Sequence, residues 1–134
     1  MNLAISLHAP DDALRRRLIP CEGLMPVNEL ISVAEDYYEA TGREVTYEYV
    51  LLAGVNDTPA HAATLAKRVR PCHASVNLIP YNAVEGSPYR RPPRKVVRAF
   101  EQVLRLEGVR VTVRRRRGDE VHGACGQLRL DALA

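Results

Sequence analysis

The segment Val45-Thr-Tyr-Glu-Tyr-Val-Leu-Leu52 decides the fold class of this 134-residue chain. It is rich in β-branched and aromatic residues and is almost continuously apolar. This composition is typical of a strand that is buried on both faces of a parallel sheet. Glu48 is the charged residue within it. Its carboxylate is either satisfied by partners in the interior or points into a functional site.

The segments on both sides of this strand alternate between strand and helix patterns. Strands are predicted at residues 3–8, 74–80 and 109–113, and helices at residues 13–18, from Pro26 to a stop at Gly42, from Pro59 behind a Thr58 N-cap, and at residues 94–106. Helices of this length between strands imply right-handed βαβ units on a parallel sheet. The predicted fold class is therefore α/β, as either a small open sheet or the later part of a (β/α) barrel.

Functional sites of such folds lie at the carboxyl ends of the strands. These ends are predicted at Ser6-Leu7-His8, at Leu51-Leu52, at Pro80-Tyr-Asn82 and at the arginines up to Arg117. The loop from Tyr81 to Pro93 is long enough to be functional rather than a simple connection. A site is therefore expected along this edge of the sheet.

Composition places the chain among ordinary globular proteins, with 46% hydrophobic and 26% charged residues. No apolar run approaches the ~20 residues of a membrane helix, and no signal peptide is recognised. The three cysteines are too widely spaced for a disulfide framework or a metal knuckle. These features predict a cytoplasmic protein without membrane association.

Nucleotide and metal binding are not predicted from motifs. Neither of the two glycine-rich phosphate-loop patterns occurs in the sequence. His122 with Cys125, and Cys72 with His73, supply two ligands each, fewer than a zinc site requires. His8 and His61 are isolated from other ligand-type residues in the sequence.

Charge is divided between the two halves of the chain. Residues 1–60 carry four arginines and ten acidic residues, for a net −6, whereas residues 86–117 carry eleven basic residues and two glutamates, for a net +9. Concentrated positive charge favours a polyanionic partner, nucleic acid first, because phosphate neutralisation releases counterions. The alternative is a solvated helix face.

Cys125 is the candidate reactive residue. It lies between Ala124 and Gly126, which leave room for a substrate, and four successive arginines at residues 114–117 favour its thiolate form. A catalytic pair with His122 or His8 is conceivable. The alternative interpretation is that Cys125 is a small buried apolar residue in a turn.

Five collinear segments closely resemble the C-terminal half of a known enzyme family. They are residues 3–10 (LAISLHAP), 48–57 (EYVLLAGVND), 76–82 (VNLIPYN), 86–89 (GSPY) and 117–128 (RGDEVHGACGQL). The family comprises the radical S-adenosylmethionine methyltransferases that methylate carbon 2 of an adenine in 23S ribosomal RNA and in some transfer RNAs. The resemblance covers nearly the whole chain and implies the later part of a partial (β/α) barrel, with a basic strand and a cysteine-bearing loop at its end.

The resemblance also implies roles for individual residues. Ser6, Leu7, His8 and Asn82 match positions that bind S-adenosylmethionine, and Cys125 matches the cysteine that first accepts a methyl group. Sulfur suits this role because it is a soft nucleophile and stabilises an adjacent radical. The basic half would hold phosphates of 23S rRNA or tRNA. The full-length enzyme is expected to be a monomer.

Several parts of the family pattern do not occur in residues 1–134. The C-x-x-x-C-x-x-C ligands of a [4Fe-4S] cluster, the Gly-Glu motif, the general base and the second cysteine are missing, and Glu120, His122 and Gly123 are modest departures. The chain is thus interpreted as the C-terminal part of the methyltransferase domain, lacking the N-terminal cluster-binding part. Alone, it is predicted to be inactive.

Two further hypotheses belong to other classes. The chain could be a stand-alone RNA-binding module derived from the enzyme, in which the basic strand persists and Cys125 no longer reacts. It could also be an unrelated small α/β hydrolase that uses Cys125. In the fragment interpretation, the strand at residues 3–8 would expose an unpaired apolar edge, and instability is expected.

Overall fold

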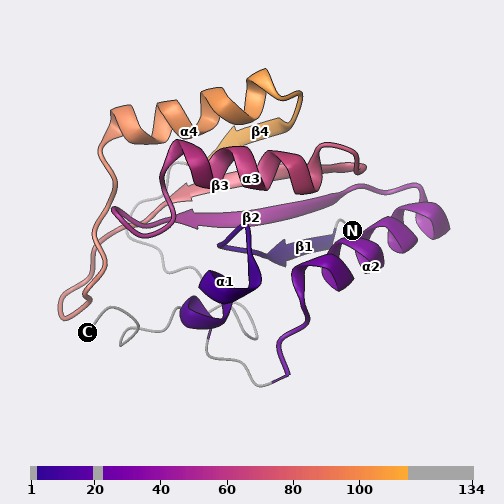
Figure 1. Ribbon diagram of the computed structural model, residues 1–134, viewed down its shortest axis with the longest axis horizontal. Helices are drawn as coiled ribbons and strands as arrows, with labels where there is room; N and C mark the ends of the chain where they lie inside the picture. Colours follow the sequence, from indigo (N-terminus) through magenta and orange to yellow (C-terminus); the bar gives the residue numbers. More distant parts are fainter. Residues whose placement is uncertain (1–2, 20–22, 115–134) are drawn as a thin grey trace.

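The computed structural model describes residues 3–19 and 23–114. Four parallel strands pair in chain order: β1 (Leu3–Ser6), β2 (Val45–Leu51), β3 (Ala74–Pro80) and β4 (Arg110–Val113). The helices between them are α1 (Asp12–Leu18), α2 (Val27–Thr41), α3 (Pro59–Val69) and α4 (Arg94–Leu106). Figure 1 shows this order, with β1 and β4 at opposite edges of the described sheet. The predicted α/β class and parallel sheet are confirmed.

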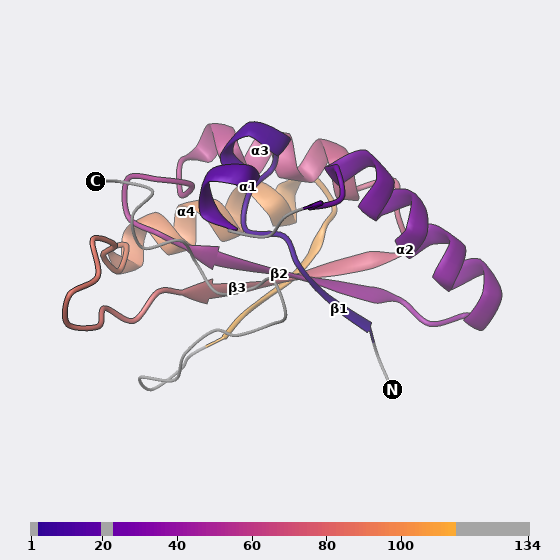
Figure 2. The same ribbon diagram turned by 90° about the horizontal axis from the view of Figure 1, so that it is seen from below.

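The helices lie on one side of the sheet (Figure 2). The main core therefore forms between them and the odd-numbered residues of β2, and the Tyr49 ring lies 5.2 Å from the Phe100 ring of α4. Thr46 and Glu48 point to the other face and are only partly buried. The prediction that β2 is buried on both faces is thus wrong along its first half. The reason is that no described helix packs against this part of the second face.

The carboxyl end of that second face is nevertheless covered. Val50 and Ile79 are buried there in a smaller cluster with Leu18, Ile19 and Tyr89. These partners come from the segments that follow β1 and β3, not from the long helices. The helix-free face is therefore polar toward the beginning of the strands and apolar toward their carboxyl ends.

β1 is shorter than predicted. It ends at Ser6 rather than at residue 8, although the Leu7 N–H still donates to the Glu48 carbonyl at 2.9 Å. His8 has a left-handed backbone with φ of 62°, which turns the chain away from the sheet. β1 is the edge strand of the described sheet, as expected, and its apolar residues Leu3 and Ile5 pack partly against the core.

Local signals placed the helix ends correctly. Gly42 ends α2 with φ of 72°, and Thr58 caps α3 with Pro59 in the first turn. His61 takes part in this cap, because its backbone N–H donates to Thr58 Oγ1 at 3.1 Å and its ring nitrogen lies 2.7 Å from the same oxygen. None of the described helices combines the length and apolar character needed to cross a membrane.

Thr58→Ala is expected to lower the free energy of unfolding by about 1 kcal/mol, because α3 loses its N-cap acceptor. Urea denaturation measures this effect. Thr64→Ala is the matched control within the same helix, since Thr64 is exposed and bonds only back to the Ala60 carbonyl. Equal losses for the two variants would show that the cap contributes nothing specific.

Candidate functional site

The turn after β1 buries a histidine. His8 is fully buried, and its Nδ1 accepts a hydrogen bond from the Val50 N–H at 3.1 Å. Its carbonyl accepts another from Asn56 Nδ2 at 2.8 Å. His8 is therefore tied into the fold, although not by other metal-ligand residues. It bridges the ends of β1 and β2 through contacts that no sequence neighbour reveals.

The protonation state of His8 follows from these contacts. Burial, and to a lesser extent the nearby Arg15 charge, lowers its pKa from 6.5 to about 3, so the ring is neutral near pH 7. Because Nδ1 accepts from the Val50 N–H, the ring proton resides on Nε2. Nε2 is buried and has no hydrogen-bond partner among the described residues. The Nε2–H group is thus a buried donor that is available to an acceptor.

Arg15 of α1 holds the backbone of this turn. Its guanidinium donates to the Ser6 carbonyl at 3.1 Å, to the Leu7 carbonyl at 3.1 Å and to the Met25 carbonyl at 2.9 Å. The residue is only 4% exposed, and burial lowers its pKa while the Asp12 carboxylate opposes this. Charge-assisted hydrogen bonds to three carbonyls compensate for the buried charge. Arg15 therefore fixes the path of the chain from Ser6 to His8.

Asn56, in the loop after β2, also holds the backbone of the turn after β1. Its Nδ2 also donates to the Val50 carbonyl at 2.7 Å, and its Oδ1 accepts from the Leu52 N–H at 2.8 Å. The Tyr49 hydroxyl in turn donates to the Asn56 carbonyl at 2.7 Å. This buried amide thereby locks the ends of β1 and β2 together.

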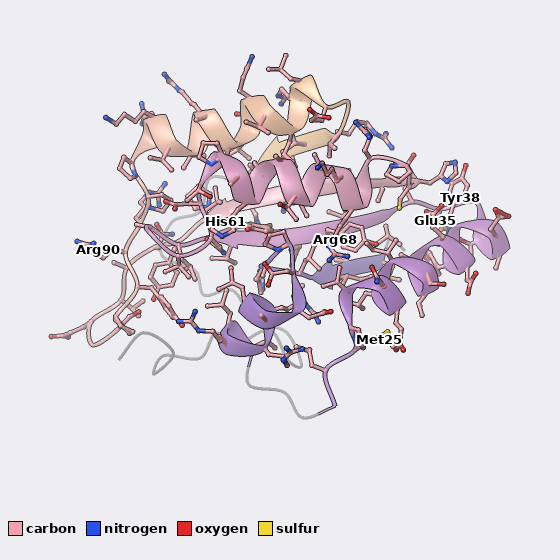
Figure 3. The ribbon with its side chains drawn as sticks, in the orientation of Figure 1. Met25, Glu35, Tyr38, His61, Arg68 and Arg90 are labelled. Carbon is pink, nitrogen blue, oxygen red and sulfur yellow. The ribbon has the colours of Figure 1, made fainter. Side chains whose placement is uncertain are left out.

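The loop after β3 is organised around Ser87. Its Oγ accepts from the Tyr81 hydroxyl at 2.7 Å and from the Tyr89 N–H at 3.1 Å. Asn82 is partly buried, and its Oδ1 accepts from Arg91 Nη1. The loop is tied to the end of β2 by a hydrogen bond from the Ala53 N–H to the Arg90 carbonyl at 2.9 Å, while the Arg90 side chain points away from the sheet (Figure 3).

The predicted site residues thus share one edge of the sheet. Ser6 ends β1 and is followed by Leu7 and His8, and Asn82 follows β3, with β2 between the two strands. In the described part of the chain, no hydrogen bond joins Asn82 to His8. Cys125, His122, Glu120, Gly123 and Arg115 to Arg117 lie outside the described residues.

A row of polar side chains crosses the helix-free face. Ser6, Glu48, Asn77 and Thr112 are register partners across the four strands. Glu48 is partly buried and forms an ion pair with Arg114 at 3.8 Å. Glu48 therefore has a partner but is not fully buried, and its role in a functional site stays a prediction.

The other sequence candidates do not form a reactive or metal-binding site. Cys72 is a free thiol whose pKa is raised, first by burial and then by the Glu35 carboxylate. His73 stacks on Tyr38 with ring centroids 3.9 Å apart, and Glu35 and Tyr38 lie together at one end of α2 (Figure 3). Within residues 3–19 and 23–114, no group of three potential ligands could hold a metal ion.

Arg15 and Asn56 are the site residues that sequence reasoning missed. Arg15 lies three positions before the buried Leu18, so helical periodicity could have distinguished it from Arg16 and Arg17. Asn56 lies in a segment that was interpreted only as a turn. Its partner His8 is 48 positions away, and no local signal indicates that contact.

Comparison with known proteins places the chain in a family. No protein-family model matches it. A probable dual-specificity RNA methyltransferase RlmN from Nostoc punctiforme is 51% identical over 129 residues, which are 96% of this chain and 35% of that protein. The ribosomal RNA large subunit methyltransferase N of Nitrosopumilus maritimus is 48% identical over 133 residues, 99% of this chain and 38% of that protein.

Solved structures agree with these relatives. A radical SAM methyltransferase from Sphaerobacter thermophilus superimposes with a TM-score of 0.85 at 46% identity, over 98% of this chain and 38% of that one. The chain belongs to this methyltransferase family. It spans little more than a third of the relatives that it matches. A domain of a pyruvate-formate lyase-activating enzyme from Bacteroides vulgatus, with a TM-score of 0.63 at 20% identity, shares the fold.

Proposed function

We propose that this chain is the C-terminal part of a radical S-adenosylmethionine enzyme that methylates carbon 2 of an adenine in 23S rRNA and in tRNA. The observation that carries the proposal is the buried Nε2–H of His8 at the carboxyl end of β1, which has no hydrogen-bond partner within residues 3–19 and 23–114. The chain's similarity to proteins named RNA methyltransferases supports the reaction class. We further expect the complete protein to act as a cytoplasmic monomer.

The edge built by Arg15 and Asn56 suits S-adenosylmethionine. That cofactor carries hydroxyl, carboxylate and adenine acceptors, and it supplies the methyl group and the radical initiator of this chemistry when bound. His8 would donate from Nε2 to one such acceptor, and Ser6 and Asn82 would provide further polar contacts. Arg15 would act as a positioning residue, since it already bonds the carbonyls of Ser6 and Leu7.

The iron–sulfur cluster does not fit residues of this chain. Its C-x-x-x-C-x-x-C ligand motif does not occur in the 134 residues, and the described part offers no alternative ligand group. We propose that the rest of the protein holds the cluster. The 134-residue chain alone is then expected not to methylate RNA, even with S-adenosylmethionine and a reductant.

Cys125 would be the residue that accepts the methyl group before its transfer to RNA. This assignment rests on the match of Ala124-Cys-Gly-Gln127 to the family motif, in which Gly123 is a departure. The thiolate is the reactive form, and the arginines at residues 114–117 would favour it electrostatically.

A chimera tests the proposed function. The corresponding segment of the Sphaerobacter thermophilus methyltransferase is replaced by this chain, and methylation of a 23S rRNA fragment and of tRNA is measured by mass spectrometry of nucleosides. The chimera is expected to form C2-methyladenine, and its Cys125→Ala variant is expected to form none. A folded chimera that binds RNA without methylating it would contradict the proposal and would favour the RNA-binding module instead.

A further inference from the structure

A basic cavity lies beside the loop that carries Asn82. Its volume is about 190 Å³, and it opens between the first turns of α4 and the ends of β3 and β4. Its lining comprises Pro80, Val97 and Val113 as an apolar floor, with Arg91, Arg94 and Arg98 around them. Three guanidinium groups thus surround a space that is larger than a single ordered water requires.

The positive charge of this cavity is not compensated within the described part of the chain. Arg94 and Arg98 are exposed, lie one turn apart on α4, and form no ion pair with any described carboxylate. Glu101 also lines the cavity, but its Oε2 accepts from Arg105 Nε at 2.9 Å and from Arg105 Nη2 at 2.8 Å. The acid that could neutralise the cavity is therefore already engaged.

The start of α4 adds to the positive electrostatic potential at the cavity. The helix has 13 residues, its N-cap Pro93 makes no side-chain capping bond, and its first turn contains no acidic residue. Backbone N–H groups and the positive end of the helix dipole lie there, where anions are stabilised and cations are not. Arg94 and Lys95 in this first turn are therefore electrostatically unfavourable for an isolated helix. An anion bound beside these two side chains would offset their repulsion by the positive end of the helix dipole.

We propose that this cavity binds a backbone phosphate of the RNA substrate. Arginine forks match phosphate oxygens in bidentate geometry, and three arginines line this cavity beside the start of α4. Arg91 also donates to Asn82, so the cavity is joined directly to the edge proposed to bind the cofactor. A phosphate held here would position the RNA strand next to the reacting edge.

This site deepens the proposed function and rests on it for the identity of its ligand as RNA. The phosphate chemistry could also serve a free nucleotide. RNA is favoured because the cavity is open at the surface and its three arginines belong to the segment of the sequence that carries the concentrated positive charge, which suits an extended polyanion.

Binding of a short single-stranded RNA, followed by fluorescence anisotropy over a range of salt concentrations, tests the site. In the 134-residue chain, Arg94→Gln/Arg98→Gln is expected to weaken binding and to make the slope of log K against log salt shallower by about 0.7, the value for one single-strand phosphate contact. Arg16→Gln/Arg17→Gln removes the same charge from exposed positions on α1, next to the opposite edge strand of the sheet, and should leave the slope unchanged. Arg94→Lys/Arg98→Lys should keep the slope but lose part of the affinity.

Three outcomes would overturn the site. The first is an unchanged salt slope in Arg94→Gln/Arg98→Gln, and the second is an equal change in the α1 control. The third is that the chain binds inorganic phosphate but does not bind RNA. Circular dichroism confirms that each variant is folded, and the same substitutions in the chimera repeat the comparison if the chain alone is unstable. RNA binding is measured without the cofactor. Failure of RNA binding at this cavity would therefore not contradict the proposed methylation, and failure of methylation would not contradict RNA binding at this cavity.

Discussion

Arg15→Met is expected to destabilise the protein by about 3 kcal/mol, because it removes the donors of three backbone carbonyls at once. Each buried carbonyl left without a partner costs roughly 1–3 kcal/mol, and removal of a buried charge returns part of that loss. Methionine retains the aliphatic stem, so the effect reports mainly on the guanidinium. The shift in the midpoint of guanidinium chloride denaturation, at unchanged slope, measures it.

Arg16→Met is the matched control for this prediction. Arg16 is the next residue of α1, is exposed, and makes no hydrogen bond to a described residue. Its replacement is expected to change stability by less than about 0.5 kcal/mol. Equal effects at the two positions would mean that Arg15 does not hold the turn after β1.

Stability is expected to fall as the pH is lowered through the range from about 6.5 to about 3, in part because of His8. Its pKa in the folded state lies below that of the unfolded chain, so the unfolded state binds more protons in this window. The contribution is fully present above pH 6.5 and is lost toward pH 3. The full shift corresponds to a loss on the order of 5 kcal/mol.

His8→Asn isolates this contribution from that of the carboxylates. Asparagine tolerates the left-handed backbone, and its Oδ1 can accept from the Val50 N–H as Nδ1 does in the native protein. The variant is expected to retain most of the stability near neutral pH and to show a weaker decline between pH 6.5 and 3. Urea denaturation of both proteins across this range makes the comparison. Parallel pH profiles would show that His8 does not stay neutral in the folded state.

Much of the fold could be predicted because its signals are local. Thr58 and Pro59 mark the start of α3, Gly42 marks the end of α2, and the apolar run at residues 45–52 indicates a buried parallel strand. Each depends on the backbone preferences of a few neighbouring residues. Such signals do not depend on how the elements later pack.

Errors arose where burial depends on the packing of distant elements. Thr46 and Glu48 are only partly buried because α2, α3 and α4 pack on the opposite face, and nothing in β2 itself indicates that. His8 depends on Asn56, which is far away in sequence. The same holds for Arg15, whose acceptors on Leu7, Ser6 and Met25 lie 8, 9 and 10 positions away in the sequence. The residues proposed to bind S-adenosylmethionine could be predicted from the resemblance to the family. Arg15 and Asn56, which hold the backbone around them, could not.

Binding of S-adenosylmethionine to the chimera, by isothermal titration calorimetry near neutral pH, tests most directly whether the edge held by Arg15 and Asn56 is the cofactor site. His8→Asn preserves the contact to Val50 but lacks the Nε2 donor, so its affinity is expected to fall about tenfold, the value of one buried hydrogen bond. Equal affinity of the native and His8→Asn chimeras, with both proteins folded, would contradict the placement of the cofactor at the end of β1.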